Sequence, residues 1–198
     1  MTAEDRALEL ARKMGILRPK DLRAHGIART HLQRLLAKDK LRKVGRGLYV
    51  LATLEPAMHS SLAAVARKTP AAVVCLLSAL RVHELTTQAP FEVWIAIPTG
   101  HRQPKIEGVP LRVVRMATAP HTAGVEQHTI EGVSVPVFDV EKTVADCFRF
   151  RNRIGLDVAL EAMRDYLRRP GRSVDRLLHY ARINRVAATI RPYLEAML

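Results

Sequence analysis

The stretch KVGRGLYVL constrains the fold more than any other part of the sequence, because two glycines one residue apart interrupt two strand-like runs. Gly45 and Gly47 can adopt the positive φ angles that a tight connection requires. Residues 41–44 and 48–51 are therefore predicted to form a short antiparallel hairpin with Arg46 at its tip.

Three short helices are predicted ahead of this hairpin. Apolar residues recur at i, i+3, i+4 and i+7 between residues 7 and 14, which predicts a helix that Gly15 ends. Pro19 suits a first helical turn and Gly26 suits a helix end, so a second helix is expected between them. A third helix follows directly.

The third helix has an apolar side and a polar side. At about 100° per residue, its leucines gather on one side, while Thr30, Gln33 and Arg34 gather nearly opposite. Three helices followed by a hairpin describe a winged helix-turn-helix, whose third helix can enter the DNA major groove. Gln can pair in bidentate fashion with adenine and Arg with guanine. The predicted DNA-binding residues are Arg29, Thr30, His31, Gln33, Arg34, Lys38, Lys43 and Arg46.

The charge distribution supports a polyanionic partner. The chain carries 32 Lys+Arg against 19 Asp+Glu, a net charge of +13. Residues 1–55 hold a net charge of +7 and residues 142–198 a net charge of +6, with a neutral middle. Such a surface attracts nucleic acid and speeds encounter with it, although the Arg residues of the last third are also what ordinary solvated helices carry.

A break near residues 52–59 separates the first region from the rest of the chain, since Pro56 and the serines after it are typical of a linker and a helix start. Apolar spacing then predicts a helix that Pro70 ends, and the segment AAVVCLLSALRVHEL is apolar enough to be buried. FEVWIAIP, LRVVRM and VSVPVFDV are predicted strands. Pro136 makes the last of them an edge or irregular strand. IEGVP and IEGVSVP are predicted glycine-centred turns.

Helices return in the last third of the chain. Apolar stripes predict helices around residues 144–148 and 156–167, and Ser173 can cap another. The order of helix, strands and helices favours an α+β fold. We therefore predict two domains: a winged helix-turn-helix in residues 1–55 and a larger α+β domain in residues 56–198.

Catalytic and metal-binding motifs are absent from the sequence, which has no phosphate loop, no G-x-S-x-G elbow and no H-E-x-x-H helix. The histidines match no usual metal spacing. Asp139, Glu141 and Asp146 lie near one predicted helix start, where capping and the helix dipole explain acidic residues. No catalytic residue, cofactor or metal is predicted, although spacing alone leaves a nuclease or nucleotidyltransferase remnant open.

The cellular setting is also predicted from the sequence. Cys75 and Cys147 lie in apolar contexts without C-x-x-C spacing, which predicts two buried free thiols. The first residues, MTAEDRALELARKMG, lack the apolar core of a secretory signal, and no apolar stretch approaches the roughly 20 residues of a membrane span. We expect a cytoplasmic protein without membrane contact.

Longer segments carry a family resemblance that spans nearly the whole chain. HLQRLLAKDKLRKVGRGLYVL, SALRVHELTTQAPFEVWIAIP, VFDVEKTVADCFRFRNRIGLDVALEAMRDYL and LLHYARINRVAATIRPYLEAML together resemble the AbiEi family of bacterial antitoxins and transcriptional regulators. Many winged helices share something like the first segment. The block FDVEKTVADCFRFRNRIG is more distinctive.

The resemblance implies a type IV toxin–antitoxin system. Its winged helix would repress its own operon by binding promoter repeats, and its second domain would protect against a nucleotidyltransferase toxin without needing a stable complex with it. By position, the family's DNA-reading elements fall on residues 29–38 and 43–46. A homodimer on DNA is compatible with this arrangement.

Two alternatives stay open at this stage. One is a stand-alone winged-helix transcription factor whose second domain dimerises or senses a ligand. The other is an enzyme that modifies nucleic acid and that the winged helix delivers to its substrate.

Overall fold

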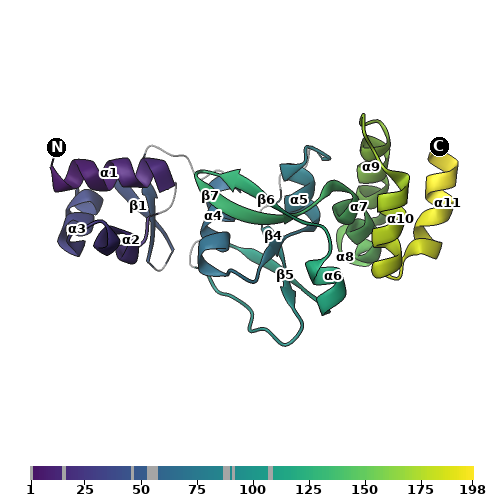
Figure 1. Cartoon of the computed structure of the whole chain (residues 1–198), viewed down its shortest axis with the longest axis horizontal. Coiled ribbons are helices and arrows are strands. Elements are labelled where there is room, and N and C mark those ends of the chain that lie inside the picture. The colour runs from purple at the N-terminus through teal and green to yellow at the C-terminus, as the bar shows by residue number, and fades with distance from the viewer. Residues whose placement is uncertain are drawn as a thin grey trace. The chain divides into compact units, whose positions relative to one another are not determined.

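The computed structural model describes residues 2–14, 17–45, 47–52, 58–86, 90, 92–106 and 109–198 (Figure 1). The chain groups into two compact units. The first comprises Met1–Pro70, Pro104–Leu111 and Gln127–Val135, and the second comprises Ala71–Gln103, Arg112–Glu126 and Pro136–Leu198.

Three helices open the first unit, as the apolar spacing predicts: α1 (Ala3–Met14), α2 (Pro19–Ala24) and α3 (Arg29–Ala37). Ala7 and Ala11 of α1 are fully buried against Leu32 and Leu35 of α3 in one apolar core. Gly26 follows α2 with a φ of +66°, which confirms its predicted place at the helix end. The prediction that Gly15 ends α1 lies outside the described residues.

The predicted hairpin is confirmed as β1 (Leu41–Gly45) paired antiparallel with β2 (Leu48–Leu51). Gly47 has a φ of +73°, which an L side chain rarely adopts. The hairpin is tied to the helices because Leu17 and Tyr49 exchange two backbone hydrogen bonds of 2.8 and 3.0 Å. Arg46, the predicted tip residue, lies outside the described residues.

Helix α4 (Met58–Lys68) also belongs to the first unit. It buries Leu62 and Val65 and ends before Pro70, as predicted. The predicted boundary between the two domains falls within residues 53–57, which lie outside the described part of the chain. That boundary stays a prediction.

A five-stranded mixed sheet follows, with the strand order β5-β4-β3-β7-β6. Its strands are β3 (Val73–Val74), β4 (Val93–Pro98), β5 (Leu111–Met116), β6 (Val125–Ile130) and β7 (Val133–Phe138). β3 pairs antiparallel with β4 and parallel with β7. β4 is buried on both faces, so its apolar residues include Trp94 and Ala96 as well as the predicted alternating set.

The turn predicted in IEGVSVP is confirmed between β6 and β7, where Glu131 and Gly132 have φ angles of +49° and +72°. The residues Glu107 and Gly108 of the other predicted turn lie outside the described residues. Pro136 is not at an edge, because β7 lies between β3 and β6. β3 is only two residues long, so its pairing with β7 needs few backbone N–H groups of β7, and the missing N–H of Pro136 is tolerated.

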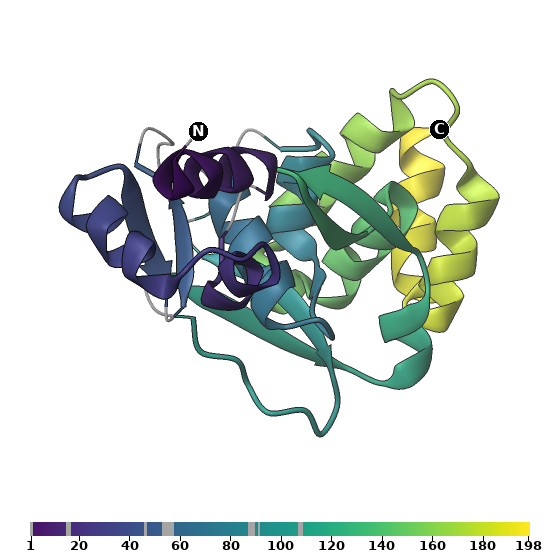
Figure 2. The ribbon, with the colours of Figure 1, turned by 60° about the vertical axis from the view of Figure 1, so that its left-hand side comes forward.

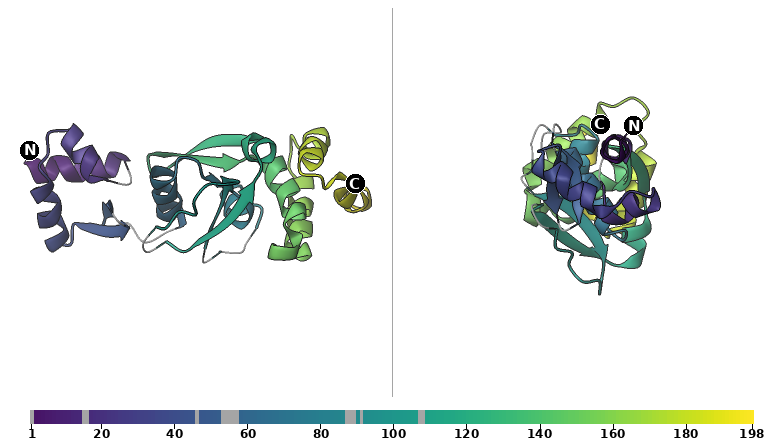
Figure 3. Two further views of the ribbon diagram at one scale, coloured as in Figure 1. Left: turned by 90° about the horizontal axis from the view of Figure 1, so that it is seen from below. Right: turned by 90° about the vertical axis from the view of Figure 1, so that its left-hand side faces the viewer.

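Helices pack against this sheet and against one another (Figures 2 and 3). They are α5 (Leu76–Val82), α6 (Thr118–Thr122), α7 (Val140–Arg149), α8 (Arg151–Ile154), α9 (Leu156–Leu167), α10 (Val174–Ile183) and α11 (Ala187–Met197). Their largest fully buried side chains include Phe138, Phe148 and Tyr166, which belong to one apolar core. α7 is enclosed almost completely, since eight of its ten residues are buried.

The fold class is α+β, as predicted. Helices dominate the last third of the chain, and the mixed sheet lies in the middle of the sequence. Within the described ranges, no helix combines the length and the apolar character needed to cross a membrane.

Candidate nucleic-acid interface

The outer face of α3 presents the three predicted base-reading residues. Thr30, Gln33 and Arg34 are all exposed, while Leu32 and Leu35 are 1% exposed on the opposite side. The leucine side is fixed by the core with α1, so the polar side is held outward. The amide and guanidinium groups on this face are the types that read adenine and guanine edges.

The first turn of α3 favours an anion. It contains no acidic residue, and no side chain caps it, because Ala28 occupies the N-cap position. The backbone N–H groups of a first helical turn have no partner within the helix, and the helix dipole adds positive potential there. Arg29 is exposed at the same end. This combination suits a phosphate group.

Lys38, predicted to contact phosphate, is already paired. Its Nζ donates a 2.7 Å hydrogen bond to Oε2 of Glu4, at the start of α1. This bond lowers the pKa of Glu4, and the nearby charges of His31 and Arg34 act in the same direction. A carboxylate therefore lies beside Lys38, at the C-terminal end of α3, a feature that the sequence did not indicate.

His31 differs from the other predicted contacts because it is only half-exposed. Its Nδ1 atom is buried and has no hydrogen-bond partner among the described residues. The ring therefore lies partly against the protein. Its role in binding DNA stays a prediction.

Lys43 is exposed on β1 and lies opposite Tyr49 of β2. It lies six residues after the end of α3, and its predicted phosphate contact stays a prediction. Arg46 lies outside the described residues, so its predicted phosphate contact stays a prediction.

A buried ion pair supports α2, the helix that precedes α3. Arg67 of α4 donates from Nη2 to Oδ2 of Asp21 at 2.6 Å, and the two side chains are 8% and 10% exposed. Asp21 also accepts a hydrogen bond from the backbone N–H of Arg18, which caps α2. Arg18 in turn donates from Nη1 to the Arg67 carbonyl oxygen at 3.0 Å. α4 therefore helps to fix the helix-turn-helix.

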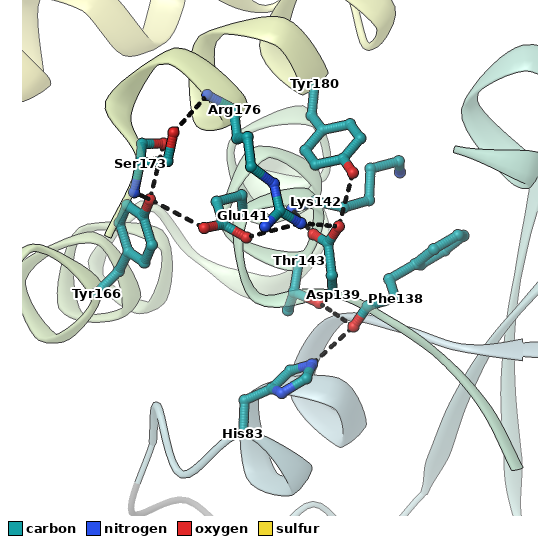
Figure 4. A network of polar contacts seen from close by, with 10 residues as sticks. All are labelled: His83, Phe138, Asp139, Glu141, Lys142, Thr143, Tyr166, Ser173, Arg176 and Tyr180. Carbon is teal, nitrogen blue, oxygen red and sulfur yellow. Dashed lines mark hydrogen bonds and ion pairs between the residues drawn. The ribbon is translucent and has the colours of Figure 1, made fainter. Parts of the chain in front are cut away.

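The second unit contains a polar network at the N-terminus of α7 (Figure 4). Asp139 is the N-cap, and its Oδ1 accepts from the backbone N–H of Lys142 at 2.7 Å. Its Oδ2 accepts from Tyr180 at 2.6 Å and from Arg176 at 3.0 Å. The predicted capping role of Asp139 is confirmed. Arg176 also pairs with Glu141 at 3.5 Å.

Tyr166 joins α9 to the loop before α10 (Figure 4). Its hydroxyl donates to the Ser173 carbonyl oxygen at 2.9 Å and accepts from the Ser173 N–H at 2.8 Å. Oε1 of Glu141 lies 3.3 Å away. Burial and the nearby carboxylate of Glu141 raise the pKa of Tyr166 to about 12. Ser173 caps α10 as predicted, accepting from the N–H of Arg176.

Asp146 is not explained by helix capping, which corrects the interpretation from sequence. It lies one turn after Lys142 in α7, and Nζ of Lys142 donates to both of its carboxylate oxygens at 2.5 and 2.6 Å. Asn184 adds a 2.7 Å hydrogen bond. Lys142 and Asp146 are fully buried, and the Lys142 ammonium also lies 4.2 Å from the centre of the Phe138 ring. Such an enclosed carboxylate is placed to hold the fold and not to touch a substrate.

The two cysteines are buried and free, as predicted. Burial raises the pKa of both thiols, and the charge of Asp146 acts in the same direction. A thiol that stays protonated is a poor nucleophile and a poor metal ligand. Among the described residues, no three His, Cys, Asp or Glu side chains gather as metal ligands would.

Comparison with known proteins agrees with this geometry. Residues 5–52 match a family described as "Transcriptional regulator, AbiEi antitoxin". The crystal structure of the RV2827C protein from Mycobacterium tuberculosis has a similar fold, with a TM-score of 0.58 and 16% sequence identity. That likeness covers 98% of this chain and 81% of the other, and at such identity it concerns the fold alone. No curated protein matches the sequence.

The matched segment runs from the start of α1 through the whole hairpin, and so contains every predicted DNA-binding residue. Residues 5–52 are thus similar to the AbiEi family of transcriptional regulators and antitoxins, the family that the sequence motifs predicted.

Proposed function

We propose that this protein is a DNA-binding transcriptional autorepressor and the antitoxin of a type IV toxin–antitoxin system that counteracts a nucleotidyltransferase toxin. The family match over residues 5–52 supports a transcriptional regulator or antitoxin. The observation that carries the proposal is the outward face of α3, where Thr30, Gln33 and Arg34 are exposed together.

The proposed complex places α3 in the major groove. Gln33 and Arg34 would read base edges, and Arg29 with the uncapped first turn would hold a backbone phosphate. Lys43 on the hairpin would contact the backbone beside the groove. Such phosphate contacts fix the position of the helix and carry little sequence information themselves.

Binding of the full chain to the DNA upstream of its own gene tests the regulatory half of the proposal. We expect binding that resists unrelated competitor DNA at a salt concentration where the competitor is released. Arg12→Ala is a suitable charge control for Arg34→Ala, because it also removes one exposed cation. Arg12 lies on α1, about 12 Å along that helix from Glu4. If binding to the upstream DNA and to the competitor weakened equally as the salt concentration rose, the interaction would be nonspecific electrostatic attraction.

The antitoxin half is tested by expressing the chain together with an adjacent nucleotidyltransferase gene. The protein should restore growth, and Arg34→Ala should do so as well, because protection is proposed to reside in the second domain. Repression without protection would instead favour a stand-alone transcription factor. Loss of protection in Arg34→Ala at unchanged protein level would contradict the proposed division between the domains.

A further inference from the structure

The second unit has a basic face of its own, which the proposed operator contact does not use. Two segments contribute to it. One is the end of α7 together with α8, and the other is the end of α10 together with the turn that follows. We call it the carboxyl-terminal basic face, and it consists of Arg149, Arg151, Arg153, Arg182 and Arg185. Arg153, Arg182 and Arg185 are exposed, and the other two are half-buried.

A hydrogen bond shows that the two segments meet. Nη1 of Arg149, at the end of α7, lies 3.5 Å from Oδ1 of Asn184, which follows α10. The neighbouring residue Arg185 begins the turn toward α11. The contact therefore joins the end of α7 to the end of α10, two of the helices that lie side by side in the helical layer of Figure 1.

Acidic residues do not offset this charge. Neither residues 147–156 nor residues 176–194 contain Asp or Glu. Within residues 109–198, which the structure describes without a gap, none of the five arginines forms an ion pair. The closest acid in the sequence, Asp146, is fully buried and is already neutralised by Lys142. By contrast, Arg168 and Arg176 elsewhere in the unit pair with carboxylates.

Several of these groups are held before any partner binds. The guanidinium carbons of Arg149 and Arg153 lie 5.5 and 5.9 Å from the centre of the Phe150 ring. Arg151 donates from Nη1 to the Phe148 carbonyl oxygen at 2.8 Å. Ordering of long cationic side chains lowers the entropy lost when they bind an anion. An ordinary solvated Arg needs no such fixation.

We propose that the carboxyl-terminal basic face binds the phosphodiester backbone of nucleic acid. Guanidinium groups match phosphate oxygens in a bidentate geometry, and cations without neighbouring acids in the sequence suit a polyanion. The half-buried Phe150 lies among the cations, which is the mixture of basic and aromatic groups common in single-stranded nucleic-acid sites. The backbone could come from duplex DNA or from RNA, and the test separates them.

Arg185 offers a substitution that keeps the fold. Its φ is +59°, in the left-handed region, where glycine meets no steric cost. Arg185→Gly therefore removes a cation of the face while relieving backbone strain. Its thermal midpoint should be equal to or above that of the wild type, so a loss of binding would not reflect unfolding.

The test compares two triple variants of the full chain with equal net charge. The first, Arg153→Gln/Arg182→Gln/Arg185→Gly, removes the exposed cations of the face. The control, Arg164→Gln/Arg168→Gln/Arg172→Gln, removes three exposed cations at the other end of α9, a 12-residue helix about 18 Å long. The probes are a single-stranded RNA of mixed sequence and an unrelated DNA duplex, each titrated over a salt series.

The same pair of triple variants is also made in an Arg34→Ala/Lys43→Ala background. This background removes the proposed operator contacts, so failure of the operator proposal and failure of this one are distinguishable. We expect the face variant, and not the control, to lower the salt slope by about 2 on RNA or by about 3 on duplex DNA in both backgrounds.

A reduced slope on RNA alone would identify RNA as the source of the phosphodiester, and a reduced slope on the duplex alone would identify DNA. Equal slopes for the face and control variants on both probes would overturn the proposal. Preferential loss of binding to an oligoglutamate peptide, with nucleic-acid binding unchanged, would overturn it in favour of an acidic protein partner.

Discussion

Glu4 places a negative charge beside the proposed DNA-binding surface of α3. The 2.7 Å bond from Lys38 holds a carboxylate against a helix that otherwise presents cations. In the proposed complex, a phosphate approaching Lys38 would meet this carboxylate, so Glu4 would oppose sequence-independent attraction. It would thereby raise the share of the binding free energy that depends on base contacts.

Glu4→Gln is therefore expected to strengthen binding to unrelated duplex DNA. Lys38 would become free to neutralise one more phosphate, and the salt slope should rise by about one. The measurement is fluorescence anisotropy with an unrelated duplex over a salt series. Glu9→Gln, an exposed charge change on the same helix, is the matched control. Identical slopes for the two variants would show that Lys38 does not reach DNA.

The buried pair of Lys142 and Asp146 leads to a prediction of the opposite kind. Asp146→Asn leaves the ammonium in an apolar enclosure without its counter-charge, which should cost about 3–5 kcal/mol of unfolding free energy. Lys142→Met/Asp146→Leu removes both charges and should cost less than Lys142→Met alone or Asp146→Leu alone. Urea denaturation of Asp146→Asn, of the double variant and of its two component single variants measures these costs. A double variant as unstable as the sum of the singles would contradict strong coupling between the two groups.

At the level of elements, α3 and the hairpin are expected to contribute different kinds of binding energy. Arg34→Ala should cost about 1–3 kcal/mol at one operator position and relax the base preference there. Lys43→Ala should weaken all sequences alike and lower the salt slope by about one. Binding to a set of single-base operator variants separates the two effects. Unchanged binding in both variants would exclude this face as the interface.

Most elements could be predicted from local patterns. The stripes of α1 and α9, the glycine after α2 and the strand-like run of β5 each depend on residues close in sequence. Pro136 was predicted to lie on an edge or irregular strand, and the edge alternative is wrong because strand order is set by distant pairing, here between β7 and the very short β3. Asp146 was likewise misread because its nearest acids suggested capping, whereas its partner is Lys142, one turn away within an enclosed helix.

The candidate interface was predictable in part for the same reason. Helical periodicity alone places Thr30, Gln33 and Arg34 outward, opposite the leucines. The contacts of Glu4 with Lys38 and of Asp21 with Arg67 join residues 34 and 46 positions apart. A single sequence carries no signal for such pairs, although an Arg in the last turn of a half-apolar helix could have prompted a search for its acid.

At the scale of the whole molecule, the basic ends of the chain have distinct structural settings. The first unit carries exposed cations on α3 and the hairpin, and Lys38, directly after α3, is paired with Glu4. Those of the second unit include paired groups around α7 and the unpaired carboxyl-terminal basic face. The net charge of +13 is therefore not one uniform attraction but separate surfaces that can be altered independently.

The stability of the molecule should fall in strongly alkaline solution because of Tyr166. Its pKa is about 12 in the folded chain against 10 when unfolded, so folding favours the protonated hydroxyl. This contribution is fully present below pH 10 and is lost as the pH rises from 10 to 12, about 2–3 kcal/mol in all. Tyr166→Phe loses hydrogen bonds with Ser173 and should be less stable at pH 8, by about 1 kcal/mol.

The quantity to compare is the difference in unfolding free energy between the wild type and Tyr166→Phe, because other tyrosines and lysines titrate in the same pH range. In urea titrations at pH 8, 10, 11 and 12, the advantage of the wild type in unfolding free energy should shrink above pH 10 and change sign before pH 12, since only the wild type loses the contribution of the buried hydroxyl. Tyr180→Phe is a useful comparison, because burial and the hydrogen bond to Asp139 raise the pKa of Tyr180 as well. A constant difference between the wild type and Tyr166→Phe across this range would show that the Tyr166 hydroxyl titrates alike in the folded and unfolded chains.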